Sequence, residues 1–255
     1  MPPPLLLING YAATGADWDP AFLAELEAGH RVLRPDNRGT GAAPAGAGEL
    51  TIGAMAADME ALLDAEGVER LPVVGWSMGG FIAQQLALRA PERVAALVLI
   101  ATDPGGAAAI PPTPEVWARL IDHSGTPREQ ATRLISLLFP APRAKAIDAM
   151  FGEVVAAARA GLDPATLRAQ EAAMEAWHAT EQAAPGAGVP PTLVLHGTED
   201  VVIPPANAGA LAERWPGAKV ELFEGGAHAV MAQDPRRVAA AIRDHCLDPG
   251  PLLDA

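Results

Sequence analysis

The 255-residue chain is poor in cysteine and in positive charge, and both shortages exclude classes of protein. A single cysteine, Cys246, rules out an intrachain disulfide framework, and its place in a helical pattern favours a packed structural thiol over a reactive one. Lys and Arg number 18 against 31 Asp and Glu, which gives a formal net charge of −13. So acidic a surface repels phosphate backbones and anionic lipid headgroups. We therefore expect neither nucleic-acid nor membrane partners.

Long apolar runs, an export signal and metal-ligand spacings are also missing from the sequence. The longest apolar stretch, residues 94–101, is too short to cross a bilayer. The opening residues lack the basic segment and long apolar core of a signal peptide. No group of His, Cys and carboxylate residues has the spacing of metal ligands, and the glycine-containing stretch 36–41 lacks a phosphate-loop pattern, which favours a tight structural turn. We expect a soluble, cytoplasmic protein without a cofactor.

Short apolar runs alternate with helical patterns, which is typical of a parallel sheet with crossover helices. Half of the residues are hydrophobic and 19% are charged, enough for one large core. Six runs predict strands: 5–8, 31–34, 71–75, 95–100, 192–196 and 220–223. The runs at 31–34 and 220–223 mix charged and apolar residues, so we expect them near the sheet edges.

The alternation is interrupted between residues 110 and 185, where only Ala-rich helical patterning remains. Proline- and glycine-containing stretches bound this segment. We therefore expect an α/β core, residues 1–109 and 186–255, with an inserted helical cap, residues 110–185. The cap carries four aromatic side chains that are candidates for a pocket, although packing between helices is the commoner role of such residues: Trp117, Phe139, Phe151 and Trp177.

The strongest chemical signal is Gly-Trp-Ser-Met-Gly-Gly at residues 75–80. It follows an apolar strand and opens a helix, which is the context that a G-x-S-x-G elbow requires. Small residues on either side let the strand and helix backbones approach while the serine projects from a strained turn. Ser77 is therefore the candidate nucleophile.

A serine hydroxyl needs a base to remove its proton, and the base needs a carboxylate to orient it. Of six histidines, only His228 lies just beyond the last predicted strand, in a glycine-flanked loop. We expect His196, at the end of its strand, to pack beneath the site. Asp200 follows the strand at 192–196 and completes the chain order Ser, Asp, His. Asp103, just after the strand at 95–100, stays open as an alternative acid.

Acyl transfer also needs two donors directed at the developing oxyanion. The backbone N–H of Met78 follows the nucleophile at a helix start, where the helix dipole favours negative charge. The second donor is expected from the loop after the first strand, as the backbone N–H of Tyr11, the only tyrosine of the chain.

Together these residues resemble the α/β-hydrolase superfamily, and in particular its capped bacterial branch of 3-oxoadipate enol-lactonases, small carboxylesterases and cofactor-free haloperoxidases. The resemblance covers nearly the whole chain: Asn9-Gly10, the turn at 36–41, the elbow at 75–80, the loop Gly197-x-x-Asp200 and the loop ending at His228. Such relatives commonly have His-Gly in place of Asn9-Gly10. They also usually begin with an antiparallel hairpin, which is missing here, so we expect a sheet of about six strands.

The leading functional hypothesis is hydrolysis of a carboxylic ester or lactone, a small-molecule substrate, through an acyl-serine intermediate. Perhydrolysis or C–C bond hydrolysis by the same triad is an alternative, because fold and triad do not fix the reaction. A small-molecule receptor with negligible turnover is an alternative of another class. The oligomeric state stays open, with a dimer through the strand at 31–34 as one arrangement.

Overall fold

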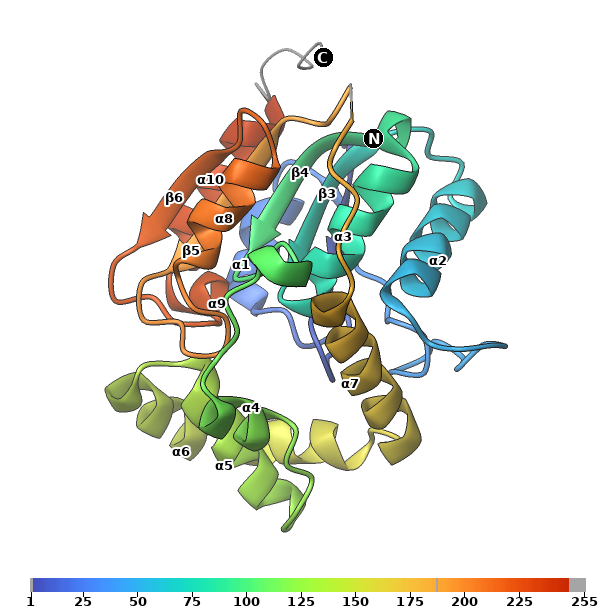
Figure 1. Ribbon diagram of the computed structural model, residues 1–255. Helices are drawn as coiled ribbons and strands as arrows, with labels where there is room; N and C mark the ends of the chain where they lie inside the picture. The colour runs from blue at the N-terminus through green and yellow to red at the C-terminus, as the bar shows by residue number, and fades with distance from the viewer. Residues whose placement is uncertain (1, 187, 248–255) are drawn as a thin grey trace.

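The computed structural model describes residues 2–186 and 188–247, and its centre is a parallel sheet with the strand order β2-β1-β3-β4-β5-β6 (Figure 1). Every neighbouring pair is parallel. The predicted six strands are therefore confirmed, and so are the edge positions of the two mixed runs. The strands are β1 (Pro4–Ile8), β2 (Arg31–Leu33), β3 (Leu71–Trp76), β4 (Val94–Ile100), β5 (Thr192–Gly197) and β6 (Lys219–Phe223).

Helices cover both faces of the sheet, so the inner strands are apolar on both sides. Leu6 and Ile8 of β1 pack into the same cluster as helices α2, α3 and α8. Leu5 and Leu7 pack on the other face, with α1, α9 and α10. These helices are α1 (Pro20–Glu27), α2 (Ile52–Ala65), α3 (Met78–Arg89), α8 (Asn207–Arg214), α9 (Val230–Gln233) and α10 (Pro235–Leu247), with short 3-10 turns at Pro91–Arg93 and Gly106–Ala108.

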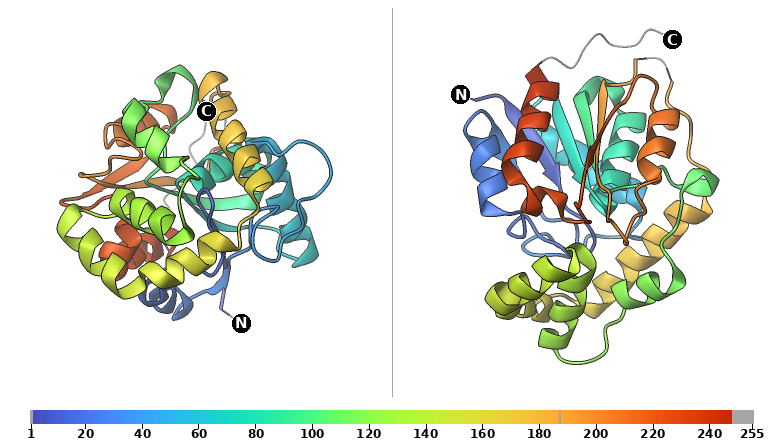
Figure 2. Two further views of the ribbon diagram at one scale, coloured as in Figure 1. Left: turned by 90° about the horizontal axis from the view of Figure 1, so that it is seen from below. Right: turned by 90° about the vertical axis from the view of Figure 1, so that its left-hand side faces the viewer.

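Four helices separate β4 from β5 and lie beyond the carboxyl ends of the strands (Figures 1 and 2). Three of them begin with a capping side chain followed by proline, a sequence that starts a helix because proline is tolerated in the first turn. The caps are Thr113, Thr126 and Asp163. The helices are α4 (Pro114–Leu120), α5 (Pro127–Leu138), α6 (Ala141–Ala160) and α7 (Pro164–Ala179).

The aromatic side chains of the insert have different surroundings. Trp177 is buried and stacks on Phe81 of α3, with ring centroids 5.2 Å apart. Phe151 is 49% exposed on α6, beside the exposed Met150 and Val154. Much of the Phe151 ring is therefore uncovered, and a pocket role for it stays a prediction. Helical periodicity reveals an apolar face without revealing whether anything packs on it.

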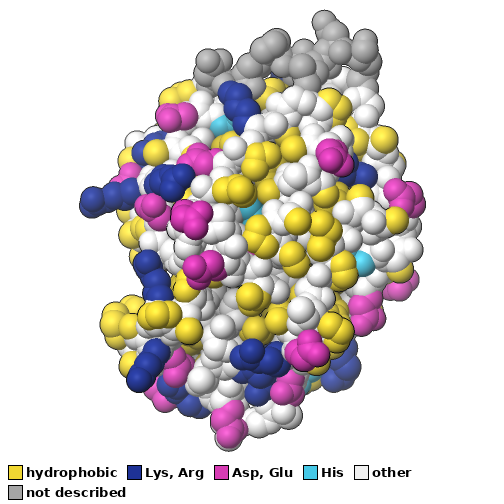
Figure 3. Space-filling model, turned by 60° about the vertical axis from the view of Figure 1, so that its left-hand side comes forward, with side chains coloured by type: hydrophobic (Ala, Val, Ile, Leu, Met, Phe, Trp, Pro, Cys, Tyr) yellow, Lys and Arg dark blue, Asp and Glu magenta, His cyan; other side chains and the backbone are white. Residues whose placement is uncertain are grey.

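Charged side chains of both signs are interspersed on the face shown in Figure 3, and hydrophobic side chains gather nearer its middle. The net negative charge is therefore not concentrated in a single patch on that face. Within the described residues, no helix has both the length and the apolar character that a membrane span requires.

Candidate active site

Ser77 lies in the turn between β3 and α3, with the left-handed φ of 56°. A non-glycine residue adopts this conformation at an energetic cost that its surroundings must offset. A Cβ atom on Gly79 would lie 2.1 Å from the Ile8 carbonyl oxygen, and one on Gly75 would lie 2.3 Å from the Gly79 carbonyl oxygen. The elbow therefore requires glycine at both positions, as the sequence pattern predicted.

His228 lies in hydrogen-bond contact with both Ser77 and Asp200. The Nε2 atom of His228 is 2.9 Å from Ser77 Oγ, and its Nδ1 atom is 2.8 Å from Asp200 Oδ2. His228 is 2% exposed and Asp200 3%. The Trp76 indole donates to the His228 carbonyl oxygen at 3.0 Å and fixes the loop that carries the imidazole. Residues far apart in the chain thus meet at the carboxyl edge of the sheet, as expected of parallel strands.

The Asp200 carboxylate is held by its own loop and by two histidines. Its Oδ1 accepts from the N–H groups of Val202 and Ile203, each at 2.9 Å. Burial alone raises the pKa of Asp200, but the charge of His228 and the close contacts with His196 and His228 outweigh it and bring the pKa to about 2. His196 is fully buried, 3.4 Å from Asp200 Oδ2, which is the position beneath the site that its sequence context indicated.

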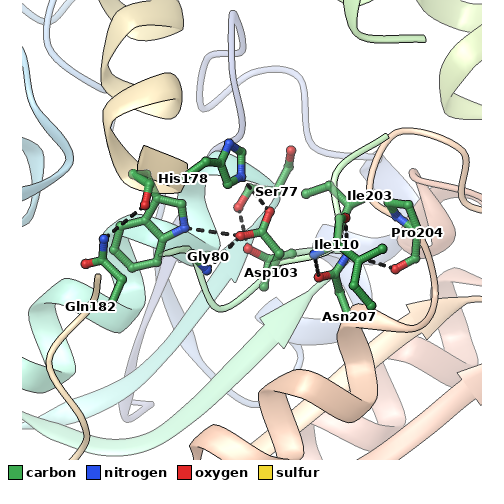
Figure 4. A network of polar contacts seen from close by, with 12 residues as sticks. Ser77, Gly80, Asp103, Ile110, His178, Gln182, Ile203, Pro204 and Asn207 are labelled. Atoms are coloured by element: carbon green, nitrogen blue, oxygen red, sulfur yellow. Dashed lines mark hydrogen bonds and ion pairs between the residues drawn. The ribbon is translucent and has the colours of Figure 1, made fainter. Parts of the chain in front are cut away.

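Asp103, the alternative acid, pairs with a different histidine. Its Oδ2 lies 3.0 Å from His178 Nε2, and its Oδ1 accepts from the Trp177 indole at 3.2 Å. Figure 4 shows Asp103 and His178 meeting close to Ser77. Because these two side-chain partners come from α7, the Asp103 carboxylate joins the helical insert to the core. Sequence reasoning gave no signal for that contact.

The backbone donors expected at the oxyanion position belong to the start of α3 and to the loop after β1. Met78 is the first residue of α3, where the helix supplies no acceptor for its N–H. The loop after β1 approaches Ser77 closely: a Cβ atom on Gly10 would lie 3.2 Å from Ser77 Cβ. Tyr11 follows Gly10, and its hydroxyl donates to Glu171 of α7 at 2.5 Å. The tyrosine ring thus packs against the core while its hydroxyl bonds the insert.

The insert is also fastened where it begins. Asn207, which is fully buried, accepts from the Ile110 N–H and donates to the Ile110 carbonyl oxygen, each at 2.8 Å (Figure 4). Its amide also donates to the Pro204 carbonyl oxygen at 3.0 Å. Since Pro204 continues the loop of Asp200, the start of the insert is tied to the segment that positions this acid.

A cleft of about 390 Å³ separates the insert from the loop after β5. Phe139 and Leu137 line it from the insert, and the loop that carries Asp200 lines it from the core. Phe139, which the sequence analysis named as a candidate pocket aromatic, thus lines a cleft. Among the residues with described positions, no group of three or more His, Cys, Asp or Glu side chains is arranged to hold a metal ion.

Comparison with known proteins agrees with this architecture. The model of the family described as the alpha/beta hydrolase fold matches residues 3–235. The protein named "Putative carbamate hydrolase RutD" from Variovorax paradoxus is 34% identical over 228 residues, 88% of this chain and 84% of that protein. The pimeloyl-[acyl-carrier protein] methyl ester esterase of Aromatoleum aromaticum is 32% identical, over 95% of this chain and 97% of its own.

Among solved structures, the enol-lactonase from Burkholderia xenovorans LB400 superposes with a TM-score of 0.78 at 26% identity, covering 97% of this chain and 92% of its own. The resemblance drawn from the sequence is confirmed by the family match and by these relatives. The chain belongs to the α/β-hydrolase fold family, and its relatives include hydrolases.

Proposed function

We propose that this protein is a serine hydrolase that cleaves a carboxylic ester or lactone through an acyl-serine intermediate. The observation that carries the proposal is the unbroken chain from Ser77 Oγ to His228 Nε2 at 2.9 Å and from His228 Nδ1 to Asp200 Oδ2 at 2.8 Å. Nucleophile, base and orienting acid in this order form the arrangement that activates a serine.

In the first half-reaction, Ser77 Oγ bonds to the substrate carbonyl carbon while its proton moves to His228 Nε2. The carbonyl oxygen becomes an oxyanion, which accepts hydrogen bonds from the backbone N–H groups of Met78 and Tyr11. His228 then gives its proton to the leaving oxygen as the carbonyl–oxygen bond breaks, which leaves the acyl group on Ser77. In a lactone, both products remain one molecule.

In the second half-reaction, water attacks the acyl carbon and His228 takes one of its protons. Collapse of the second tetrahedral species returns the proton to Ser77 Oγ and releases a carboxylic acid. Throughout, the ionised Asp200 holds the Nδ1–H and stabilises the imidazolium. Its pKa of about 2 keeps Asp200 negatively charged at every pH at which the enzyme is expected to work.

The names of the relatives support this reaction class. A carbamate, a methyl ester and an enol-lactone each contain a carbonyl carbon bonded to a heteroatom leaving group. We further propose that residues 110–185 act as a cap over the site, and that the cleft beside Phe139 belongs to the route by which substrate reaches it.

The test is turnover of p-nitrophenyl esters of increasing acyl length, simple lactones and an aryl carbamate. We expect hydrolysis of at least one class, and a loss of roughly a thousandfold or more in the Ser77→Ala variant. Ser124→Ala, in an exposed turn of the insert, is the matched control and should keep full activity. Equal activity in the wild type and the Ser77→Ala variant would exclude Ser77 as the nucleophile.

A further inference from the structure

We propose that two consecutive side chains of α7, Gln170 and Glu171, are positioning residues that hold the loop after β1 over Ser77, a role that rests on the serine-hydrolase function proposed above. The helical insert then does more than cover the site. Its helix α7 completes the oxyanion site, because the second backbone donor belongs to the loop that these two residues hold.

The first half of the loop is held by the core. Asn9 is 1% exposed; its amide donates to the Pro35 carbonyl oxygen at 2.9 Å, and its own carbonyl oxygen accepts from the Asn37 amide at 3.1 Å. Gly10 then packs directly against the nucleophile, where a Cβ atom would lie 3.2 Å from Ser77 Cβ. The backbone of Asn9 and Gly10 is therefore fixed in position before the chain reaches Tyr11.

The second half of the loop is held by α7. The Ala12 N–H donates to Gln170 Oε1 at 2.9 Å, and the Tyr11 hydroxyl donates to Glu171 Oε1 at 2.5 Å. Gln170 is fully buried, so water does not compete for its oxygen. The Gln170 hydrogen bond is thus made by the backbone of the residue that directly follows the proposed donor.

Ala12 also has a conformation that needs such support. Its φ of 55° is left-handed, a conformation that is unfavourable for a residue with a Cβ atom. The hydrogen bond to Gln170 fixes the Ala12 N–H in that orientation, and the Tyr11 peptide carbonyl is part of the same planar unit. If Gln170 could not accept, Ala12 would relax toward negative φ and rotate the peptide groups that flank Tyr11.

The Tyr11–Glu171 contact lies among further charged groups. Glu171 Oε1 is also 2.6 Å from His123 Nε2, and Arg159 of α6 is the cation near the Tyr11 hydroxyl. Burial, followed by the hydrogen bond to Glu171, raises the pKa of Tyr11 well above its ordinary value, and the hydroxyl therefore stays a neutral donor. The loop is thus tied both to α7 and, through Glu171, to the segment between α4 and α5.

Helix α7 is itself docked along its length, so it can serve as a rigid support. Near its start, Thr166 packs on Gly39, where a Cβ atom would lie 2.7 Å from the threonine Cγ2. Near its end, Trp177 and His178 bond Asp103. Gln170 lies between these two anchors, and small shifts of α7 are therefore resisted on both sides of the loop contact.

The test compares Gln170→Met, which keeps the side-chain length and removes the acceptor, with Gln170→Glu, which retains an oxygen acceptor. Arg168→Met, on the exposed face of the same helix, is the matched control. On the best p-nitrophenyl ester, we expect Gln170→Met to lower kcat by roughly tenfold to a hundredfold, with KM within about threefold of wild type. Gln170→Glu should restore most of kcat, and Arg168→Met should leave both constants unchanged.

Inhibition by phenylboronic acid separates positioning from a loss of folded protein. Its adduct with Ser77 carries an anionic oxygen at the oxyanion position, so its affinity should fall in Gln170→Met by about the same factor as kcat. A smaller amount of folded enzyme lowers kcat and leaves the affinity intact. If the boronate affinity of Gln170→Met equals that of wild type, the positioning role is wrong.

Hydrogen exchange at the Ala12 amide, measured by NMR, supplies a readout that needs no turnover. We expect protection in the wild type and in Arg168→Met, and exchange about tenfold or more faster in Gln170→Met. Unchanged exchange would overturn the role of Gln170 even if the protein is an esterase. Faster exchange in a protein that hydrolyses none of the tested esters would instead leave the loop contact standing and remove the proposed hydrolase function.

Discussion

Two aspartate–histidine pairs lie at the carboxyl edge of the same sheet, and only one of them reaches the serine. Asp200 follows β5 and Asp103 follows β4, and each is 3% exposed. Asp200 bonds His228 at 2.8 Å, and Asp103 bonds His178 at 3.0 Å. By sequence position and burial, the two carboxylates are nearly equivalent.

The pairs differ in the element that carries the histidine and in the group that its Nε2 atom contacts. His228 lies in a core loop and places Nε2 2.9 Å from Ser77 Oγ. His178 lies on α7 and uses Nε2 for Asp103 itself, while its ring meets Phe81 edge-on at 5.5 Å. An aspartate–histidine contact can therefore serve proton transfer only where a third group lies within hydrogen-bond distance of the histidine. Without such a group, the contact only joins one element to another.

The largest effect expected from this comparison is that of Asp200→Asn. Its amide would face His228 and favour the wrong imidazole tautomer, so we expect kcat to fall roughly a thousandfold to ten-thousandfold on the best ester substrate. Steady-state kinetics with the purified variant, after circular dichroism has shown that it is folded, measures this. A loss below tenfold would mean that Asp200 does not orient the base.

The next largest effect is expected from Asp103→Asn, and it should change the stability of the fold more clearly than the rate of hydrolysis. The variant keeps an oxygen for Trp177 and loses the charge beside His178, so we expect the free energy of unfolding to fall by about 1–2 kcal/mol. We expect kcat to fall less than roughly tenfold, because Asp103 affects the reaction only by anchoring α7, which in turn positions the loop after β1. Urea unfolding and the same ester assay measure both. A loss of kcat as large as that of Asp200→Asn would erase the distinction between the pairs.

The smallest effect is in the pH dependence of stability. The folded-state pKa of Asp200, about 2, lies below its ordinary value of 3.8, so its ionised form stabilises the fold above pH 4 and this contribution is lost as the pH falls toward 2. Between pH 5 and pH 3.5, the wild type should lose about half a kcal/mol more unfolding free energy than Asp200→Asn. Unfolding curves that shift in parallel would contradict the lowered pKa.

The sequence predicted the parts of the molecule that depend on local pattern. Six strands, the edge positions of β2 and β6, and the elbow around Ser77 follow from alternation, charge and glycine spacing, and the structure has all of them. The choice of Asp200 over Asp103 rested on motif context, and the structure places Asp200 beside His228. Its role in catalysis remains a prediction.

Contacts between the insert and the core were beyond sequence reasoning. Gln170, Glu171 and His178 are polar residues on a helix, and nothing in their spacing identifies a loop or an aspartate as their partner. Phe151 illustrates the same limit of sequence reasoning, because it belongs to an apolar helix face and is nevertheless 49% exposed. Which helix face meets which loop is decided by how separately formed elements dock, and a single sequence carries little record of that.

Two of the attachments of the insert, those made by Asn207 and by Asp103, differ in the groups that they recognise. Asn207 binds the N–H and the carbonyl oxygen of residue 110, groups that any amino acid except proline presents. Asp103 binds an indole and an imidazole, which only particular side chains supply. The attachment at Asn207 therefore does not depend on the side chain at residue 110, whereas the attachment at Asp103 requires particular side chains. An unrelated helical segment grafted onto this core would be accepted at the first attachment without redesign, and it would have to bring its own tryptophan and histidine to the second.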